Sequence, residues 1–455
     1  MEKSKFLVTQ ELYGDFVLIY STLTTSFVKM GKDIYHRIFE EGDFGNEELT
    51  EKLMALGMIT TSHADQLKYL DDERANSRES ERQHLTIFTT TDCNARCFYC
   101  FENGIKHLDM SKEVADATVQ FAVRNFPNKE LSLGWIGGEP LMKFDTIKYI
   151  TQKLVQEGFS LSSGVSTNGF LLSKDMIDFL KLYNEKVAIQ FSMDAAIGTE
   201  YSKIKRYVDA DENTAFQRVV DNIALSLDCG LTTDVRINFA ASKIDKAKEA
   251  FSAIKDMLAG HNLTNAFIFL VPLDLPGSKE IISDYHGNLE HPCLQAIMFQ
   301  KSMGFGVPRG QRMTPIREKL GKEHGDVVAS YALMPQCNIC SMTTRYKFVV
   351  DSDGTLYKCH RLAGHRGFSC GSVFNGIDLE SDSYKQFSET IIHDEQCLEC
   401  PILPICQGGC IGRRSLCGDN QKCHKIKQVQ KELVLLCFEE LSRTGKGNIS
   451  QITLE

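Results

Sequence analysis

Six short hydrophobic runs recur between residues 85 and 275, and helical patterns lie between them. We expect the runs to be β-strands, because they are rich in β-branched and large apolar residues and are bounded by polar residues. The predicted strands are Leu85–Thr89, Leu131–Ile136, Leu161–Ser166, Val187–Met193, Val235–Ala240 and Ala266–Val271. Strict alternation of strand and helix predicts a parallel sheet with right-handed crossovers. Six repeats predict an α/β fold, a partial (β/α)6 TIM-type barrel with its chemistry at the carboxyl ends of the strands.

Residues 1–80 show a different pattern, with strand-like runs at Lys5–Val8 and Asp15–Tyr20, then two helical patterns, then the short apolar run Met58–Ile59. This order predicts a small winged-helix-like domain. It carries no basic recognition helix, so DNA is not the expected partner; a packing or dimerisation role is the alternative. Asp71–Gln83 is rich in charge and lacks large apolar residues, so we expect a linker there.

Composition narrows the class of protein further. The net charge is −9 and no dense run of Lys and Arg occurs, which argues against nucleic acid and anionic membranes as partners. No apolar stretch reaches the roughly 18 residues of a membrane span, and the N-terminus lacks a signal-peptide core. Sixteen cysteines in such a chain argue for metal binding in a reducing cytoplasm rather than for disulfides.

The segment Cys93-Asn-Ala-Arg-Cys97-Phe-Tyr-Cys100 directly follows the first predicted strand. Three close thiols on a loop can hold three irons of a [4Fe–4S] cube and leave the fourth iron without a protein ligand. An open metal position is where a small molecule can bind and react. The alternative is a zinc site completed by a histidine such as His107.

Polar motifs follow the later strands. After the second strand come Gly137-Gly138-Glu139-Pro140, where paired glycines let the backbone approach a ligand and the carboxylate can receive an ammonium group. The third strand ends in Ser166-Thr-Asn168, the fourth in Ser192-Met-Asp194, and the fifth carries Arg236.

Together these motifs resemble the signature of the radical S-adenosylmethionine (SAM) enzymes, with Tyr99 as the usual aromatic residue before the last cysteine. The resemblance implies a SAM-binding [4Fe–4S] cluster on Cys93, Cys97 and Cys100. It implies contacts to SAM from Tyr99, Gly137, Gly138, Glu139, Ser166, Asn168, Ser192, Asp194 and Arg236. In that assignment Glu139 meets the amino group of SAM, and Arg236 offers a charge-assisted fork to its carboxylate.

A second set of cysteines begins near residue 337. Cys340, Gly354 and Cys359 are followed by Cys397-x2-Cys400-x5-Cys406-x3-Cys410 and then Cys423. This spacing resembles the SPASM pattern, which implies two auxiliary [4Fe–4S] clusters. The first would be held by Cys340, Cys359 and Cys410, with Cys337 as a possible fourth ligand. The second would be held by Cys397, Cys400, Cys406 and Cys423, and Cys417 competes with Cys423.

If Cys337 cannot reach the first auxiliary cluster, one iron there stays open to a substrate thiolate. A pair of zinc-ribbon-like sites is the alternative to the two clusters. The remaining cysteines are expected to be buried apolar residues. They are Cys229, Cys293, Cys370 and Cys437.

The whole chain resembles a radical SAM peptide maturase. The expected parts are a recognition element at 1–80, the radical SAM barrel at 84–275, a bridging region at 276–335 and a SPASM domain at 336–455. The resemblance implies that residues 1–80 bind the leader of a ribosomally made precursor peptide by strand addition. It also implies SAM and three [4Fe–4S] clusters as cofactors, and an electron donor such as flavodoxin or ferredoxin.

In the implied reaction a 5′-deoxyadenosyl radical abstracts hydrogen from a peptide carbon, a cysteine sulfur attacks that carbon, and an auxiliary cluster takes up the surplus electron. The product would be a thioether. Alternatives are a carbon–carbon crosslink, or formylglycine in a sulfatase. Sulfatase maturases have an Asp base after the cysteine that corresponds to Cys359; here that residue is His360, a candidate catalytic residue that counts against formylglycine. A zinc-stabilised regulatory protein is the non-enzymatic alternative.

Overall fold

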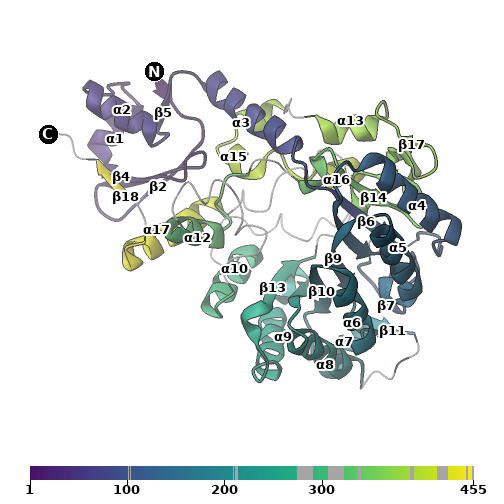
Figure 1. Cartoon of the computed structure of the whole chain (residues 1–455). Coiled ribbons are helices and arrows are strands. Elements are labelled where there is room, and N and C mark those ends of the chain that lie inside the picture. Colours follow the sequence, from purple (N-terminus) through teal and green to yellow (C-terminus); the bar gives the residue numbers. More distant parts are fainter. Residues whose placement is uncertain are drawn as a thin grey trace.

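An eight-stranded sheet forms the centre of the computed structural model (Figure 1), in the order β13-β12-β10-β9-β8-β6-β14-β15. The structure describes residues 1–100, 102, 104–208, 210, 214–273, 291–305, 322–336, 340–389, 394–417, 429–446 and 449–452. Six of the strands confirm the predicted ones to within a few residues, and they run parallel to one another. They are β6 (His84–Phe88), β8 (Glu130–Ile136), β9 (Ser160–Thr167), β10 (Lys186–Asp194), β12 (Thr232–Phe239) and β13 (Ala266–Pro272).

Helices connect these strands and lie along the outside of the sheet (Figure 1). They are α4 (Lys112–Asn125), α5 (Phe144–Gln156), α6 (Lys174–Tyr183), α7 (Gly198–Ile204), α8 (Ala215–Asp228) and α9 (Ile244–Met257). Ser111 caps α4, because its side chain accepts a hydrogen bond from the Val114 N–H.

The strands have one apolar and one polar face. On β8 the residues Leu131, Leu133 and Trp135 are buried in the core that the helices cover. The residues between them, and their counterparts on β9 and β10, are small or polar and only partly buried, as the period of two requires. This second face includes Ser132, Gly134, Ser162, Gly164, Ser166 and Ser192. It provides room and hydrogen-bonding groups at the carboxyl ends of the strands.

The C-terminal region extends the same sheet. Strand β14 (Lys347–Val350) pairs parallel with β6, and β15 (Leu356–Tyr357) pairs antiparallel with β14. The Ser352 hydroxyl donates to the Phe88 carbonyl at 3.0 Å, at the point where β6 leads into the first cysteine motif. The second group of cysteines is therefore built directly onto the barrel sheet, a connection that the sequence did not predict.

The N-terminal unit is a meander of β2 (Leu7–Glu11), β3 (Phe16–Ser21) and β4 (Phe27–Gly31), followed by α1 (Lys32–Phe39) and α2 (Glu47–Ala55). The sequence predicted two of these strands and both helices, but not β4. A short ladder joins β1 (Glu2–Lys3) to β5 (Ile59–Thr60). One face of the meander packs against α1 and α2 through a cluster that includes Val17, Ile19, Val28, Met30, Ile38 and Leu53.

The prediction of a linker at Asp71–Gln83 is wrong. Helix α3 (His63–Arg78) covers much of it, and Leu70 and Arg74 on this helix are buried. The other face of the meander also packs on distant parts of the chain, namely α10 (Pro292–Ser302), α12 (Lys322–Ser330) and α17 (Gln430–Thr444). The last strand, β18 (Ile449–Ile452), pairs parallel with β4.

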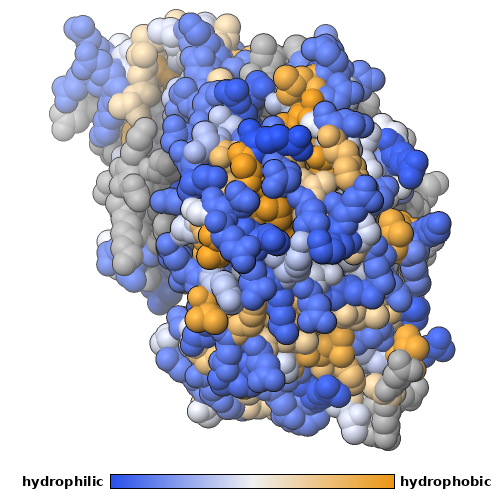
Figure 2. Space-filling model, turned by 45° about the vertical axis from the view of Figure 1, so that its right-hand side comes forward, coloured by the Kyte–Doolittle hydropathy of each residue, from blue (hydrophilic) through white to orange (hydrophobic). Residues whose placement is uncertain are grey.

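The remaining elements are short. They are β7 (Ala95–Cys97), β11 (Lys205–Tyr207), β16 (Gly371–Ser372), β17 (Gly376–Ile377), α13 (Asp382–Ser388), α14 (Glu395–Leu398), α15 (Leu403–Cys406) and α16 (Ile411–Cys417). No helix in the described part of the chain is long and apolar enough to cross a membrane. The face in Figure 2 is largely hydrophilic, and its hydrophobic residues form separate patches.

Candidate functional site

The first cysteine motif lies on the loop that follows β6, at the carboxyl edge of the sheet. Its middle part, β7, pairs antiparallel with β11, so that Lys205 lies opposite Cys97. Cys93, Cys97 and Cys100 are free thiols. Burial raises the pKa of Cys93 to about 12 and that of Cys97 to about 11, so each thiol holds its proton until a metal replaces it. Three such thiols on one loop fit a cluster with one open iron.

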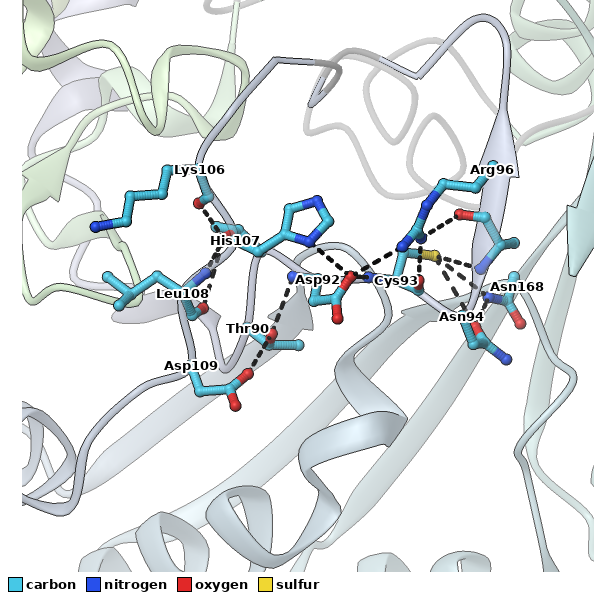
Figure 3. A network of polar contacts seen from close by, with 12 residues as sticks. Thr90, Asp92, Cys93, Asn94, Arg96, Lys106, His107, Leu108, Asp109 and Asn168 are labelled. Atoms are coloured by element: carbon cyan, nitrogen blue, oxygen red, sulfur yellow. Dashed lines mark hydrogen bonds and ion pairs between the residues drawn. The ribbon is translucent and has the colours of Figure 1, made fainter. Parts of the chain in front are cut away.

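Asp92 organises the start of this loop (Figure 3). Its carboxylate accepts a hydrogen bond from the Cys93 N–H at 2.8 Å and pairs with Arg96 at 3.4 Å. The ring of His107, the alternative zinc ligand, lies with Nδ1 3.0 Å from the same carboxylate oxygen. His107 therefore belongs to the Asp92 network in this structure.

The paired glycines after β8 allow two pieces of backbone to meet. A Cβ at Gly137 would lie 2.2 Å from the Thr90 carbonyl oxygen, and one at Gly138 would lie 2.0 Å from that of Asp92. The Gly138 N–H donates to Thr90 O and the Glu139 N–H to Asp92 O, at 3.1 and 2.9 Å. In the structure these glycines let the loop after β8 pack directly against the cysteine loop. Their expected role in letting a ligand approach stays a prediction.

Glu139 is fully buried. Its carboxylate accepts hydrogen bonds from Leu141 N, Thr167 Oγ1 and Asn168 N at 3.1, 2.7 and 2.8 Å, while burial raises its pKa. These contacts hold the end of β9 next to the loop after β8. The contact with a SAM amino group stays a prediction.

Asn168 connects the end of β9 to the cysteine loop (Figure 3). Its side-chain N–H donates to Asn94 Oδ1 at 2.7 Å, and the same nitrogen lies 3.8 Å from Cys93 Sγ. Ser166, two residues earlier, is partly buried on the polar face of the sheet. The structure thus brings the predicted residues of the second and third strand ends to the first cysteine motif.

A buried ion pair between Asp194 and Lys205 connects the end of β10 to the first cysteine motif. The Tyr99 hydroxyl donates to Asp194, and Asp194 pairs with Lys205 at 3.4 Å. Lys205 also donates to the Ser192 carbonyl. Burial opposes the charge on Lys205, but Asp194 raises its pKa well above the ordinary value. The sequence analysis missed Lys205, because only the β7–β11 pairing reveals that it lies opposite Cys97.

The fifth strand adds Arg236 and Asn238. Arg236 lies beside Ser192 in the ladder between β10 and β12, and Asn238 donates to the Ser192 hydroxyl at 3.2 Å. Burial and the charge of Arg361 lower the pKa of Arg236, and its Nε is buried with no hydrogen-bond partner among the described residues. Asn238 was also missed, since a lone Asn at a strand end carries no distinctive signal.

His360 connects the second cysteine set to this site. Its side chain is exposed to solvent, and the charges of Arg361 and Arg236 act on it. Burial, Arg361 and Arg236 lower its pKa to about 4, so the imidazole is neutral near pH 7.

Comparison with known proteins agrees with this geometry. Residues 87–241 match the family model described as Radical SAM superfamily. The chain contains a radical SAM domain. The matched segment begins in β6 and ends just after β12, so it includes the first cysteine motif and the polar residues described above.

Two curated relatives match over most of their length. The radical SAM cyclopropyl synthase TigE of Paramaledivibacter caminithermalis is 22% identical, over 84% of this chain and 79% of that enzyme. A cysteine-type anaerobic sulfatase-maturating enzyme of Clostridium novyi is 24% identical, over 70% of this chain and 85% of that enzyme. The solved structure of native anSMEcpe with bound AdoMet and Kp18Cys peptide has a TM-score of 0.57 at 17% identity, covering 79% of this chain and 99% of that chain. This structural match shows a shared fold.

Beyond the radical SAM domain, three further thiols from separate segments come together. Cys340 precedes the short helix at Ser341–Thr343, Cys359 follows β15, and Cys410 precedes α16. Burial raises the pKa of Cys340 and raises that of Cys359 to about 11, and the neighbouring thiol groups add to both shifts. A Cβ at Gly412 would lie 2.8 Å from Cys359 Sγ. These are the thiols predicted for the first auxiliary cluster.

Cys397, Cys400 and Cys406 lie on the compact turn formed by α14 and α15, where the Cys400 N–H donates to the Cys397 carbonyl at 3.0 Å. Cys337 and Cys423 lie outside the described residues. Among described residues, no three His, Cys, Asp or Glu side chains are close enough to share a single metal ion. A cube has a separate iron for each thiolate, so its ligands need not meet at one point.

The four cysteines outside the predicted clusters were expected to be buried, and two of them are fully so. Cys370 and Cys437 are fully buried, whereas Cys229 and Cys293 are partly buried.

Proposed function

We propose that this chain is a radical SAM maturase that installs thioether bonds, from cysteine sulfur to carbon, in a ribosomally made precursor peptide. The observation that carries the proposal is that residues beside both thiol groups meet at the carboxyl ends of β10 and β12. Lys205, which pairs with Asp194, lies opposite Cys97, while Arg236 lies beside Ser192 and its charge acts on His360, next to Cys359. A peptide bound near Arg236 would lie between a SAM site and an auxiliary site.

The residues present fit a SAM-bound cluster and a first auxiliary cluster, since each predicted set supplies three free thiols. When bound, the SAM cluster supplies a 5′-deoxyadenosyl radical that takes hydrogen from a peptide carbon. Lys205 and Arg236 supply positive charge for the SAM carboxylate, and Asp194 fixes Lys205 in place. Closing a thioether releases the thiol proton, which neutral His360 can accept, and one surplus electron; Cys340, Cys359 and Cys410 would hold an auxiliary cluster that would supply the acceptor for that electron.

Residues 1–80 are the proposed recognition element. The meander β2-β3-β4 with α1 and α2 is a small sheet of the kind to which leader capture by β-addition adds a strand, and in the structure its β4 edge is paired with β18. The cytoplasmic location and an electron donor of the flavodoxin or ferredoxin type remain part of the proposal, as does the second auxiliary cluster on Cys397, Cys400, Cys406 and Cys423.

Two other products belong to the same chemistry. The similarity to TigE, a cyclopropyl synthase, favours carbon–carbon bond formation as the alternative. The similarity to a sulfatase-maturating enzyme favours formylglycine, although His360 replaces the Asp base of that reaction.

The test uses the anaerobically reconstituted, reduced protein with SAM and a cysteine-rich peptide encoded beside its gene. A thioether removes two hydrogen atoms from the peptide per bond and blocks alkylation of the cysteine, whereas a carbon–carbon bond leaves the cysteine reactive. Mass spectrometry before and after alkylation distinguishes them. The His360→Ala variant should still form 5′-deoxyadenosine but give less product. An unchanged peptide with the wild-type enzyme would contradict the proposal.

A further inference from the structure

The N-terminal sheet contains a strand from the opposite end of the chain. Its order is β18-β4-β3-β2, and β18 pairs parallel with β4 from Ile449 opposite Phe27 to Ile452 opposite Met30. Figure 1 shows β18 beside β4, with both chain termini near this unit. The strand edge of β4 is therefore already paired, by the protein's own C-terminal segment.

The two outer strands of the meander have different neighbours. Helix α17 contacts β2 on the face of the sheet that includes Val8. At the β4 edge, β18 is the neighbour, and within the described residues β18 pairs with no further strand. An extended peptide that pairs with β4 itself must take the position of β18, because a strand edge accepts one partner.

The contact between β18 and β4 combines backbone pairing with one apolar side chain. Ile449 packs against the cluster formed by the sheet, α12 and α17, which includes Phe27. Helix α17 ends at Gly445, whose left-handed conformation (φ 64°) redirects the chain toward the edge. The ladder covers only four residues, Ile449–Ile452.

We propose that β18 is an internal competitor for the peptide-docking edge: it pairs with β4 in the absence of precursor, and a strand of the leader displaces it. The inference rests on the proposed leader binding by residues 1–80. The chemistry that fits is an extended peptide with an aliphatic side chain at the position of Ile449, held mainly by backbone hydrogen bonds.

The tether makes this competition measurable. Only three residues separate Gly445 from β18, and short tethers give effective concentrations of about 1 mM. A free peptide that binds the vacant edge with a Kd of about 10 µM should therefore bind the intact chain about 100-fold more weakly.

The probe is a fluorescein-labelled synthetic peptide with the sequence of residues 447–455, followed by anisotropy. It should bind a chain that ends at Lys446 and bind the full chain about 100-fold more weakly. The full-length Ser450→Pro/Gln451→Pro variant should bind the probe like the shortened chain. In a parallel ladder one of these two N–H groups faces β4, and proline removes both. Lys446→Ala, which lies outside the ladder, should behave like the wild type, and all variants should form 5′-deoxyadenosine equally.

Failure of the probe to bind the shortened chain, or equal binding to both chains, would overturn the inference. A precursor peptide that the enzyme modifies but that does not displace the probe would overturn it while leaving the proposed function intact. A protein that binds the probe as expected but modifies no peptide would contradict the proposed function alone.

Discussion

The loop that carries Cys93 is held by backbone contacts that only glycine permits. Changing Gly138 to Ala would place a methyl group 2.0 Å from the Asp92 carbonyl oxygen, which cannot move without moving Cys93. We expect a loss of SAM cleavage of at least about 100-fold, because misplacement by about 1 Å has that effect on reacting groups. Rates of 5′-deoxyadenosine formation measure it. Gly260→Ala is the control, since nothing lies within 4 Å of its Cβ position, and equal rates in the two variants would refute the packing argument.

Lys205 and Asp194 form a pair that is almost inaccessible, with side-chain exposures of 2% and 1%. Lys205→Met leaves Asp194 charged and unpaired, which should cost about 3–5 kcal/mol of the free energy of unfolding. The double variant Lys205→Met/Asp194→Asn should recover most of that stability but not SAM affinity. Urea unfolding and SAM titration measure the two quantities. A Lys205→Met protein as stable as the wild type would show that the pair contributes nothing.

The sequence predicted most of this site, but not all of it. The three cysteines and the polar strand ends could be found because their spacing along the chain is itself the signal. Lys205 could not, since its partner Cys97 is far away in sequence and the pairing of β7 with β11 brings them together. The contact of Gly138 with Asp92 could not be predicted either, because spacing does not reveal which backbone lies opposite a glycine.

At the level of elements, α3 packs against the turn that carries Cys397, where we propose the second auxiliary cluster. Leu70 on α3 is buried with Phe6 and Leu403, next to Cys397. Leu70→Ala should lower the free energy of unfolding by about 2–5 kcal/mol and reduce bound iron by up to about one third, the share of one cube in three. Thermal unfolding and iron analysis test this. Leu182→Ala on α6, at an exposed position (75%), is the control, and equal iron contents would contradict the coupling.

The elements themselves were predictable where their patterns are local. The six parallel strands are regular hydrophobic runs, so their ends were predicted to within a few residues. Helix α3 was taken for a linker because its apolar contacts are few among many charges. Strands β14 and β18 are short, and they are strands only because β6 and β4, far away in the sequence, offer them an edge.

At the scale of the molecule, the two cysteine regions should have separable roles. Cys406 lies on the turn with α15, away from the barrel motif, so Cys406→Ala should leave SAM cleavage intact. We expect modified peptide to disappear, because the second auxiliary site loses a ligand. Parallel measurement of 5′-deoxyadenosine and peptide mass shows the separation. Normal peptide product would remove any essential role for that site.

The most direct test of the whole account is the formation of 5′-deoxyadenosine from SAM by the anaerobically reconstituted, reduced protein and its Cys97→Ala variant. The wild type should bind about twelve irons, from three cubes, and cleave SAM. The variant should lose about one third of the iron and all cleavage, because two thiols cannot keep the cube at this loop. Undiminished 5′-deoxyadenosine from Cys97→Ala, or a wild-type protein that holds zinc and leaves SAM intact, would contradict the assignment of radical SAM chemistry to this site.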